Sequence, residues 1–259
     1  MLSGTLLVPR LPTSAISGWR KRCRGLKKGQ ERRTEKDRLR LIDEAANLIK
    51  DRYTLRSLVL SVFSPAHDGA AVTLSNVFFH LARHPRVWSK LRSEIMKDAS
   101  QPITYELLNS YTYLKNVFRE SKSLVPTPLL IALLFQDVVL PCGGGTDGSA
   151  PLYCRKGDLI GAGYRTMMRD PDFWGPGAEQ FMPERWETVR PGWEYLPFGG
   201  GPRQCVGMRL VFTECAFTTV KTMRAFERLE NRDEEFEWKE QMRMTWQNKN
   251  GTLVGLVND

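Results

Sequence analysis

A short glycine-rich loop near the C-terminus places one cysteine directly before a strongly amphipathic segment. The loop reads Phe198-Gly-Gly-Gly201-Pro-Arg203-Gln-Cys205-Val-Gly207. Glycines allow backbone N–H groups to approach the sulfur closely, and the N-terminus of a following helix carries a partial positive charge. Both effects favour the thiolate over the thiol, and a thiolate binds metal ions. Arg203 adds a fixed cation that suits a carboxylate on whatever the sulfur ligates.

These ten residues fit the pattern Phe-x-x-Gly-x-Arg-x-Cys-x-Gly, through which the chain resembles the cytochrome P450 monooxygenases. The resemblance implies that Cys205 is the axial thiolate of a haem iron and that Arg203 contacts a haem propionate. It also implies that Phe198, Gly201 and Gly207 shape the cofactor-binding loop. A free cysteine is often only a small core residue, and Cys205 without its frame would be interpreted that way. With the frame, the haem interpretation is preferred.

A second match is the run AHDGAA at residues 66–71, which we expect in the middle of a long helix. The family carries an acid and a threonine here, beside the place where dioxygen binds. The resemblance implies that Asp68 lies in the proton path, because a carboxylate on a kinked helix can relay protons. Gly69 stands at the position of the threonine, so the relay hydroxyl is missing. Taken alone, Asp68 would be interpreted as a solvent-facing charge.

A third match joins Glu120 to Arg185, which lies in a Pro-Glu-Arg-Trp run. In the family a glutamate, an arginine three residues later and a second arginine brace the cysteine loop. The resemblance implies this structural role for Glu120 and Arg185, but Ser123 replaces the first arginine. Lys122 cannot substitute, because adjacent positions point about 100° apart around a helix. No basic residue lies between Lys122 and Arg155, where the family commonly has an arginine that reaches a propionate.

The hydrophobic pattern predicts mainly helices with small strands. Helices are expected over residues 31–50, 52–83, 87–97, the second part of 103–123, and 206–226. Pro65 is expected to interrupt and kink the second of these. Strands are expected from residue 125 and over 151–166, an irregular aromatic-packed meander over 171–197, and a hairpin around Asn248–Gly251. The last helix is expected to bury Met208, Phe212, Met223 and Phe226. The resemblance implies the same class, the C-terminal half of the P450 fold.

The chain divides into a basic start and the part that resembles the family. Between Arg20 and Arg40, eleven Lys and Arg stand against three acids, a local +8 within a net charge of +9. Such a run could bind nucleic acid or an acidic membrane. No nucleic-acid motif accompanies it, so a solvated segment is favoured. We expect residues 1–36 to be poorly ordered and residues 37–259 to form a truncated P450 haem domain, a fragment that lacks the N-terminal half.

The cysteines and histidines bear on the redox compartment of the protein and on whether it binds zinc. Five cysteines without a CxxC pair indicate a reducing compartment, and three histidines without ligand spacing argue against zinc. No apolar run is long enough to span a membrane, and no secretory signal is evident. A mitochondrial transit peptide is a minor alternative. Membrane association is expected only if the missing half carries an anchor. The resemblance implies the endoplasmic reticulum membrane, whereas the chain as given would be cytoplasmic.

Two functions remain open at this point. The resemblance, closest to fungal members that oxidise alkanes or fatty acids, implies O2-dependent hydroxylation of an apolar small molecule by a haem enzyme. It also implies NADPH as the electron source, through a flavoprotein reductase. The alternative is a catalytically inactive remnant that at most binds haem, because three family residues are absent and the chain is short.

Overall fold

The computed structural model describes residues 41–125, 130–242 and 245–258. The chain divides into two compact units, Met1–Leu60 and Ser61–Asp259. In the first unit, the described residues form α2 (Leu41–Leu48) and the first part of α3 (Arg52–Arg83). The predicted poor order of residues 1–36, and the start of the predicted helix over 31–50, lie outside the described residues.

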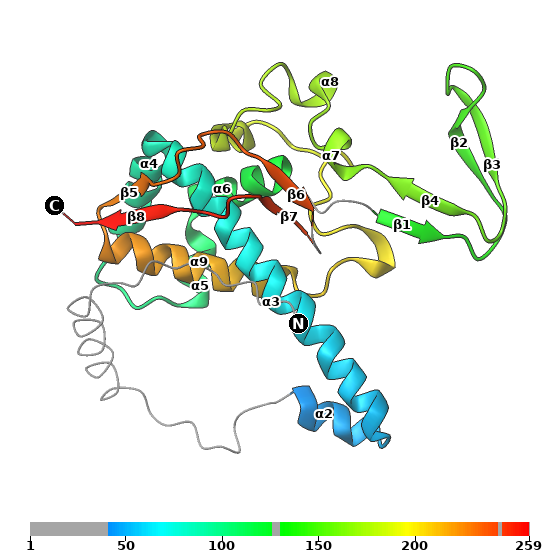
Figure 1. The fold of residues 1–259 in the computed structure, drawn as a ribbon, viewed down its shortest axis with the longest axis horizontal. Helices are drawn as coiled ribbons and strands as arrows, with labels where there is room; N and C mark the ends of the chain where they lie inside the picture. The colour runs from blue at the N-terminus through cyan, green and yellow to red at the C-terminus, as the bar shows by residue number, and fades with distance from the viewer. Residues whose placement is uncertain (1–40, 126–129, 243–244, 259) are drawn as a thin grey trace. The chain divides into compact units, whose positions relative to one another are not determined.

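The second unit is built mainly from helices that share one core. After the rest of α3 come α4 (Pro85–Met96), α5 (Tyr105–Ser110), α6 (Thr112–Leu124) and α9 (Met208–Ala225). α9 contacts α4 and α5, and α4 contacts α6 (Figure 1). Their apolar faces meet in a core that includes Val77, Leu81, Leu91, Leu114, Val117, Ala216 and Val220. None of the described helices is long and apolar enough to cross a membrane.

The described strands form four antiparallel pairs. β1 (Leu130–Leu133) pairs with β4 (Leu159–Ala162), and β2 (Val138–Gly144) pairs with β3 (Ala150–Cys154). β5 (Arg228–Asn231) pairs with β8 (Val254–Val257), and β6 (Glu240–Met242) pairs with β7 (Trp246–Asn248). The predicted class, mainly α with small β elements, is confirmed. The expected strand over 151–166 is two strands followed by the short helix α7 (Tyr164–Met167).

The predicted hairpin around Asn248–Gly251 is misplaced. The strands that pair are β6 and β7, so their connection lies between Met242 and Trp246. The Asn248–Gly251 turn leads instead into β8, whose partner is β5. The buried Asn248 side chain explains this local shape, because its amide donates to the Gly251 carbonyl at 2.8 Å and its oxygen accepts the Lys239 N–H at 3.2 Å. At this turn, hydrogen bonds of the Asn248 side chain take the place of backbone hydrogen bonds between paired strands.

The predicted helix over residues 52–83 is confirmed, because α3 runs from Arg52 to Arg83 with Pro65 inside it. A proline inside a helix removes one N–H donor and crowds the preceding turn. Around Pro65 the helix is largely exposed, with Phe63 64% accessible. We infer that the lost hydrogen bond is tolerated because water can satisfy the backbone on an exposed face.

The meander between α7 and the cysteine loop is packed by aromatic rings, as predicted. It contains α8 (Pro171–Trp174) and a 3-10 turn over Pro183–Glu187. Ring centroids lie 5.5 Å apart between Trp174 and Trp186, and 4.6 Å apart between Trp186 and Tyr195. This cluster gives the irregular chain a small core of its own.

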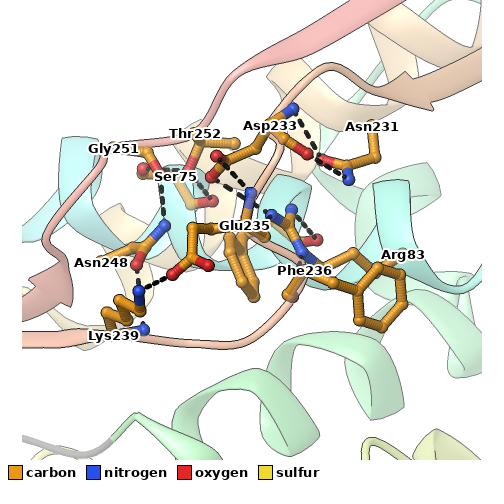
Figure 2. Close-up of polar contacts among 11 residues, drawn as sticks. Ser75, Arg83, Asn231, Asp233, Glu235, Phe236, Lys239, Asn248, Gly251 and Thr252 are labelled. Carbon is orange, nitrogen blue, oxygen red and sulfur yellow. Dashed lines mark hydrogen bonds and ion pairs between the residues drawn. The ribbon is translucent and has the colours of Figure 1, made fainter.

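A buried arginine fastens the C-terminal strands to α3 (Figure 2). Arg83 donates to the backbone carbonyls of Glu235 and Phe236, each at 2.7 Å, and pairs with Asp233 at 3.3 Å. The Arg83 and Asp233 side chains are only 2% and 6% exposed. Because these three bonds join segments far apart in sequence, the pair fixes where residues 233–236 lie on α3.

Near this cluster, a histidine is buried between aromatic rings. The His80 ring stacks on Phe181 at 4.6 Å and faces Trp238 at 6.0 Å. Burial, with smaller contributions from the nearby His84 and Arg83, lowers the pKa of His80 to about 3. His80 therefore stays neutral in the folded state at any pH well above 3.

We expect His80 to make folding stability fall in acid, and His80→Phe to remove this dependence. The unfolded chain binds a proton below a pKa of 6.5, while folded His80 does not until about 3. Stability contributed by the neutral ring should therefore fall between pH 6.5 and 3, by about 1.4 kcal/mol per pH unit at most. Urea unfolding from pH 7 to 4 measures it. The exposed His67→Phe serves as the control, and equal slopes for His80→Phe and the parent would contradict the prediction.

Candidate functional site

The cysteine loop is a tight turn closed by a backbone hydrogen bond. The Cys205 N–H donates to the Phe198 carbonyl at 3.0 Å. Gly199 and Gly201 have φ values of 70° and 68°, a region that residues with a Cβ rarely adopt. A 3-10 turn over Gly201–Arg203 then leads to the cysteine. The glycines are thus required by the turn that presents Cys205.

The Cys205 side chain is exposed and lies directly before α9. The next residue, Val206, is 99% accessible. Gly207 is the N-cap of α9, and its missing side chain leaves the first N–H groups of the helix without a side-chain cap. A Cβ added at Gly207 would lie 3.7 Å from the Cys205 sulfur. The N-terminus of α9 is therefore open beside the thiol.

Arg203 and Asp68 are not in contact with Cys205 in the described structure. The Arg203 side chain is exposed. Asp68 lies on α3 with its side chain 44% exposed, and its Oδ1 is 3.2 Å from the Nδ1 of His67. α3 and α9 meet further along, where the Cys215 thiol donates to the Ala70 carbonyl at 3.5 Å. In sequence, Asp68 comes shortly before Ala70, and Cys205 comes before Cys215.

The residues of the cysteine loop suit the binding of a haem through its iron. A haem held through a cysteine needs a sulfur that can approach the iron, and a cation suits its negatively charged propionates. The Cys205 sulfur is accessible, the glycine at 207 leaves room beside it, and Arg203 is an exposed cation two residues away. Cys142 is also exposed, but it lies in β2 without this frame. Among the residues that the structure describes, no cluster of His, Cys, Asp and Glu suits a metal ion.

The structure brings Glu120 and Arg185 together in a buried brace. One Glu120 oxygen accepts the Met182 N–H at 2.8 Å and the Arg185 Nε–H at 3.0 Å. The other accepts the Trp186 indole N–H at 2.7 Å. Burial raises the pKa of Glu120, and these donors partly offset the rise. Arg185 also donates to the carbonyls of Trp174, Gly177 and Gln180. One carboxylate therefore holds α6 to the meander.

Ser123 stands at the position where the family has an arginine, and it bonds to the meander in another way. Its hydroxyl donates to the Met168 carbonyl at 3.1 Å, and the residue is 5% exposed. The next residue along, Arg169, donates to the Leu124 carbonyl and pairs with Glu179 at 2.5 Å. Sequence reasoning missed Arg169, because no periodicity marks a cation in the meander. The α6–meander contact is thus bridged by a serine and a second arginine.

Lys122 takes no part in the brace and faces the cysteine loop. Its Nζ lies 5.5 Å from the centroid of the Phe198 ring. Burial lowers the pKa of Lys122 to about 8, and the thiols of Cys215 and Cys205 act in the opposite direction. The prediction that Lys122 does not replace the arginine is confirmed by this placement.

The family model that matches this chain is Cytochrome P450, over residues 30–254. Among the curated relatives, cytochrome P450 monooxygenase iliC of Hypocrea jecorina is 42% identical over 200 residues, 77% of this chain and 44% of that protein. Cytochrome P450 monooxygenase fumoA of Cordyceps fumosorosea is 40% identical over 82% of this chain and 40% of its own length. Cytochrome P450 monooxygenase iccC of Talaromyces variabilis is 38% identical over 85% of this chain and 44% of its own length. The chain spans less than half the length of these relatives.

Proposed function

Because the chain belongs to the cytochrome P450 family, we propose that it binds haem and serves O2-dependent hydroxylation of an apolar small molecule. Enzymes of this family use haem and O2 with a redox partner, and the family is commonly membrane-associated. The observation that carries the proposal is the exposed Cys205 thiol, presented by a glycine turn at the open N-terminus of α9. An alkane or a fatty acid is the substrate class we propose.

Each residue of the site receives a proposed role. Cys205 would hold the iron, Arg203 would hold a propionate, and Phe198, Gly201 and Gly207 would keep the loop in shape. When bound, haem supplies the chemistry that inserts one oxygen atom of O2 into a C–H bond and reduces the other to water. The Glu120–Arg185 brace would keep the meander, and with it the loop, in place.

The proton supply is proposed to run through Asp68. Its carboxylate would hold a proton and could pass it on. Gly69 offers no hydroxyl, but the His67 Nδ1 lies 3.2 Å from Asp68 Oδ1 and can exchange a proton with it. Electrons are proposed to come from NADPH through a flavoprotein reductase at the endoplasmic reticulum membrane.

A second candidate is a haem-binding protein without turnover. It is favoured by two observations: Gly69 lacks the relay hydroxyl, and Ser123 bonds to the Met168 carbonyl where the family has an arginine. In this case the cysteine loop would still hold the iron, but O2 chemistry would not be completed.

We expect the chain to take up haem with a stoichiometry of one, as titration followed by absorbance would measure. After reduction, the carbon monoxide complex should show the long-wavelength Soret band that distinguishes thiolate from imidazole ligation. Lauric acid, a reductase and NADPH are then added, and hydroxylated product is measured. Thiolate-type binding without product would support the second candidate. Failure to take up haem would overturn both.

A further inference from the structure

The short helix α7 follows β4 along the chain and leads into the meander (Figure 1). It is a single turn, which the Met168 N–H closes by donating to the Tyr164 carbonyl at 2.8 Å. The residues at its two ends are buried, since Tyr164 is 3% and Met168 is 1% exposed. A turn that is buried at both ends has a neighbour at each end.

At its C-terminal end, α7 is bonded to the last turn of α6. The Ser123 hydroxyl donates to the Met168 carbonyl at 3.1 Å, and the Arg169 guanidinium donates to the Leu124 carbonyl. Leu124 is the last residue of α6, where the backbone carbonyls have no N–H partner within the helix and a cation is favoured. The Arg169 side chain is only 10% exposed. Two side chains, one from each side of the contact, therefore tie α7 to α6.

At its N-terminal end, α7 reaches the cysteine loop. A Cβ added at Gly199 would lie 3.7 Å from the Tyr164 hydroxyl oxygen, an ordinary van der Waals distance. Gly199 follows Phe198, whose carbonyl accepts the Cys205 N–H and closes the loop. The Tyr164 hydroxyl is buried and has no hydrogen-bond partner in the described part of the chain. The ring therefore ends beside the backbone that closes the loop.

The cysteine loop needs such a neighbour, because its own backbone bonds are local. Besides the Cys205 bond, the Gly199 N–H donates to the Leu196 carbonyl and the Gln204 N–H donates to the Gly201 carbonyl, each at 3.1 Å. These bonds set the shape of the loop but not its place relative to the helices. A group that ligates a metal has to be held within about 0.5 Å of its productive position. Contacts from outside the loop have to supply that placement.

We propose that α7 is a strut that positions the cysteine loop relative to α6. Ser123 and Arg169 hold one end of the strut, and Tyr164 supports the loop at the other. The inference rests on the proposed role of Cys205 as the iron ligand. Because Ser123 stands where the family has an arginine, the strut gives the loop a support that the absent residue does not provide.

Amide hydrogen exchange on the full, haem-free chain tests the strut without relying on haem. Ser123→Ala and Arg169→Met should each speed exchange in the peptide that contains Cys205 by about fivefold, the factor to which one net hydrogen bond corresponds. Exchange in β5, which pairs with β8, should stay as in the parent. Equal acceleration in both segments would indicate a loss of global stability only and would overturn the proposal, as would unchanged exchange in the loop.

Tyr164→Phe separates support of the loop from stability of the fold. It removes only the atom that reaches Gly199, and that atom has no hydrogen-bond partner in the part of the chain that the structure describes. Exchange in the loop should become faster while the free energy of unfolding in urea stays unchanged. Loop exchange as slow as in the parent would contradict support by Tyr164.

The matched control for Arg169→Met is Arg86→Met, which changes an exposed arginine of α4. It should exchange like the parent, and an acceleration of the loop equal to that in Arg169→Met would overturn the proposal. With haem added, Arg169→Met should lose part of the thiolate-type band of the reduced carbon monoxide complex, whereas Arg86→Met should keep it. A parent chain that takes up no haem would overturn the proposed function, and the exchange result would still decide whether the strut exists.

Discussion

Cys205→Ala is expected to lower haem affinity by more than about 100-fold, the upper end of what loss of a supporting residue costs a metal site. The variant removes the only proposed iron ligand, and a methyl group offers no lone pair. Haem that still associates should lack the thiolate-type band of the reduced carbon monoxide complex. Absorbance titration and this spectrum measure both effects.

Cys142→Ala is the matched control, because Cys142 is also exposed but lies in β2. It should bind haem like the parent. Cys205→Ala should keep the parent's circular dichroism, since the side chain is exposed and its backbone bond to Phe198 does not need the sulfur. If Cys205→Ala keeps both the affinity and the thiolate spectrum, the iron ligand is another residue.

The second large effect is expected from Glu120→Ala, which should lower the free energy of unfolding by about 3–5 kcal/mol. Glu120 is 1% and Arg185 is 8% exposed, so the change strands a buried guanidinium. It also removes the acceptor for the N–H groups of Met182 and Trp186. Urea unfolding with a fixed slope measures the loss.

Glu187→Ala removes an exposed carboxylate, 56% accessible and 3.5 Å from Lys90, and should cost less than about 1 kcal/mol. A double variant sharpens the test. Glu120→Ala with Arg185→Met should lose less stability than the sum of the two single variants, because the second change removes the stranded charge. Additive losses would show that the two residues do not stabilise the fold as a pair.

Much of the helical framework follows from the sequence, because long amphipathic periods are local. α9 begins and ends within two residues of its prediction, and α6 ends one residue beyond the predicted range. The partnership of Glu120 and Arg185 was also accessible, although only through the resemblance to a family. Their 65-residue separation gives no local signal.

What the sequence could not predict depends on partners that lie far away in the chain. β8 is four residues long and could pair with several strands, and only its tertiary neighbours select β5. The tolerance of Pro65 depends on exposure of that face. A cavity lined by residues of α5, α6, the meander and α9 forms only where these elements converge, so Lys122 and Arg209 were not recognised as neighbours.

The distant bonds of Arg83 and Ser75 have a consequence for how the chain is made. Arg83 contacts Asp233 across 150 positions, and Ser75 contacts Thr252 across 177. A polypeptide emerges from the ribosome N-terminus first, at about 5–20 residues per second. The end of α3 therefore waits many seconds for the residues that cover its guanidinium and its polar groups. During that interval these groups lack their native hydrogen-bond partners and are left to water.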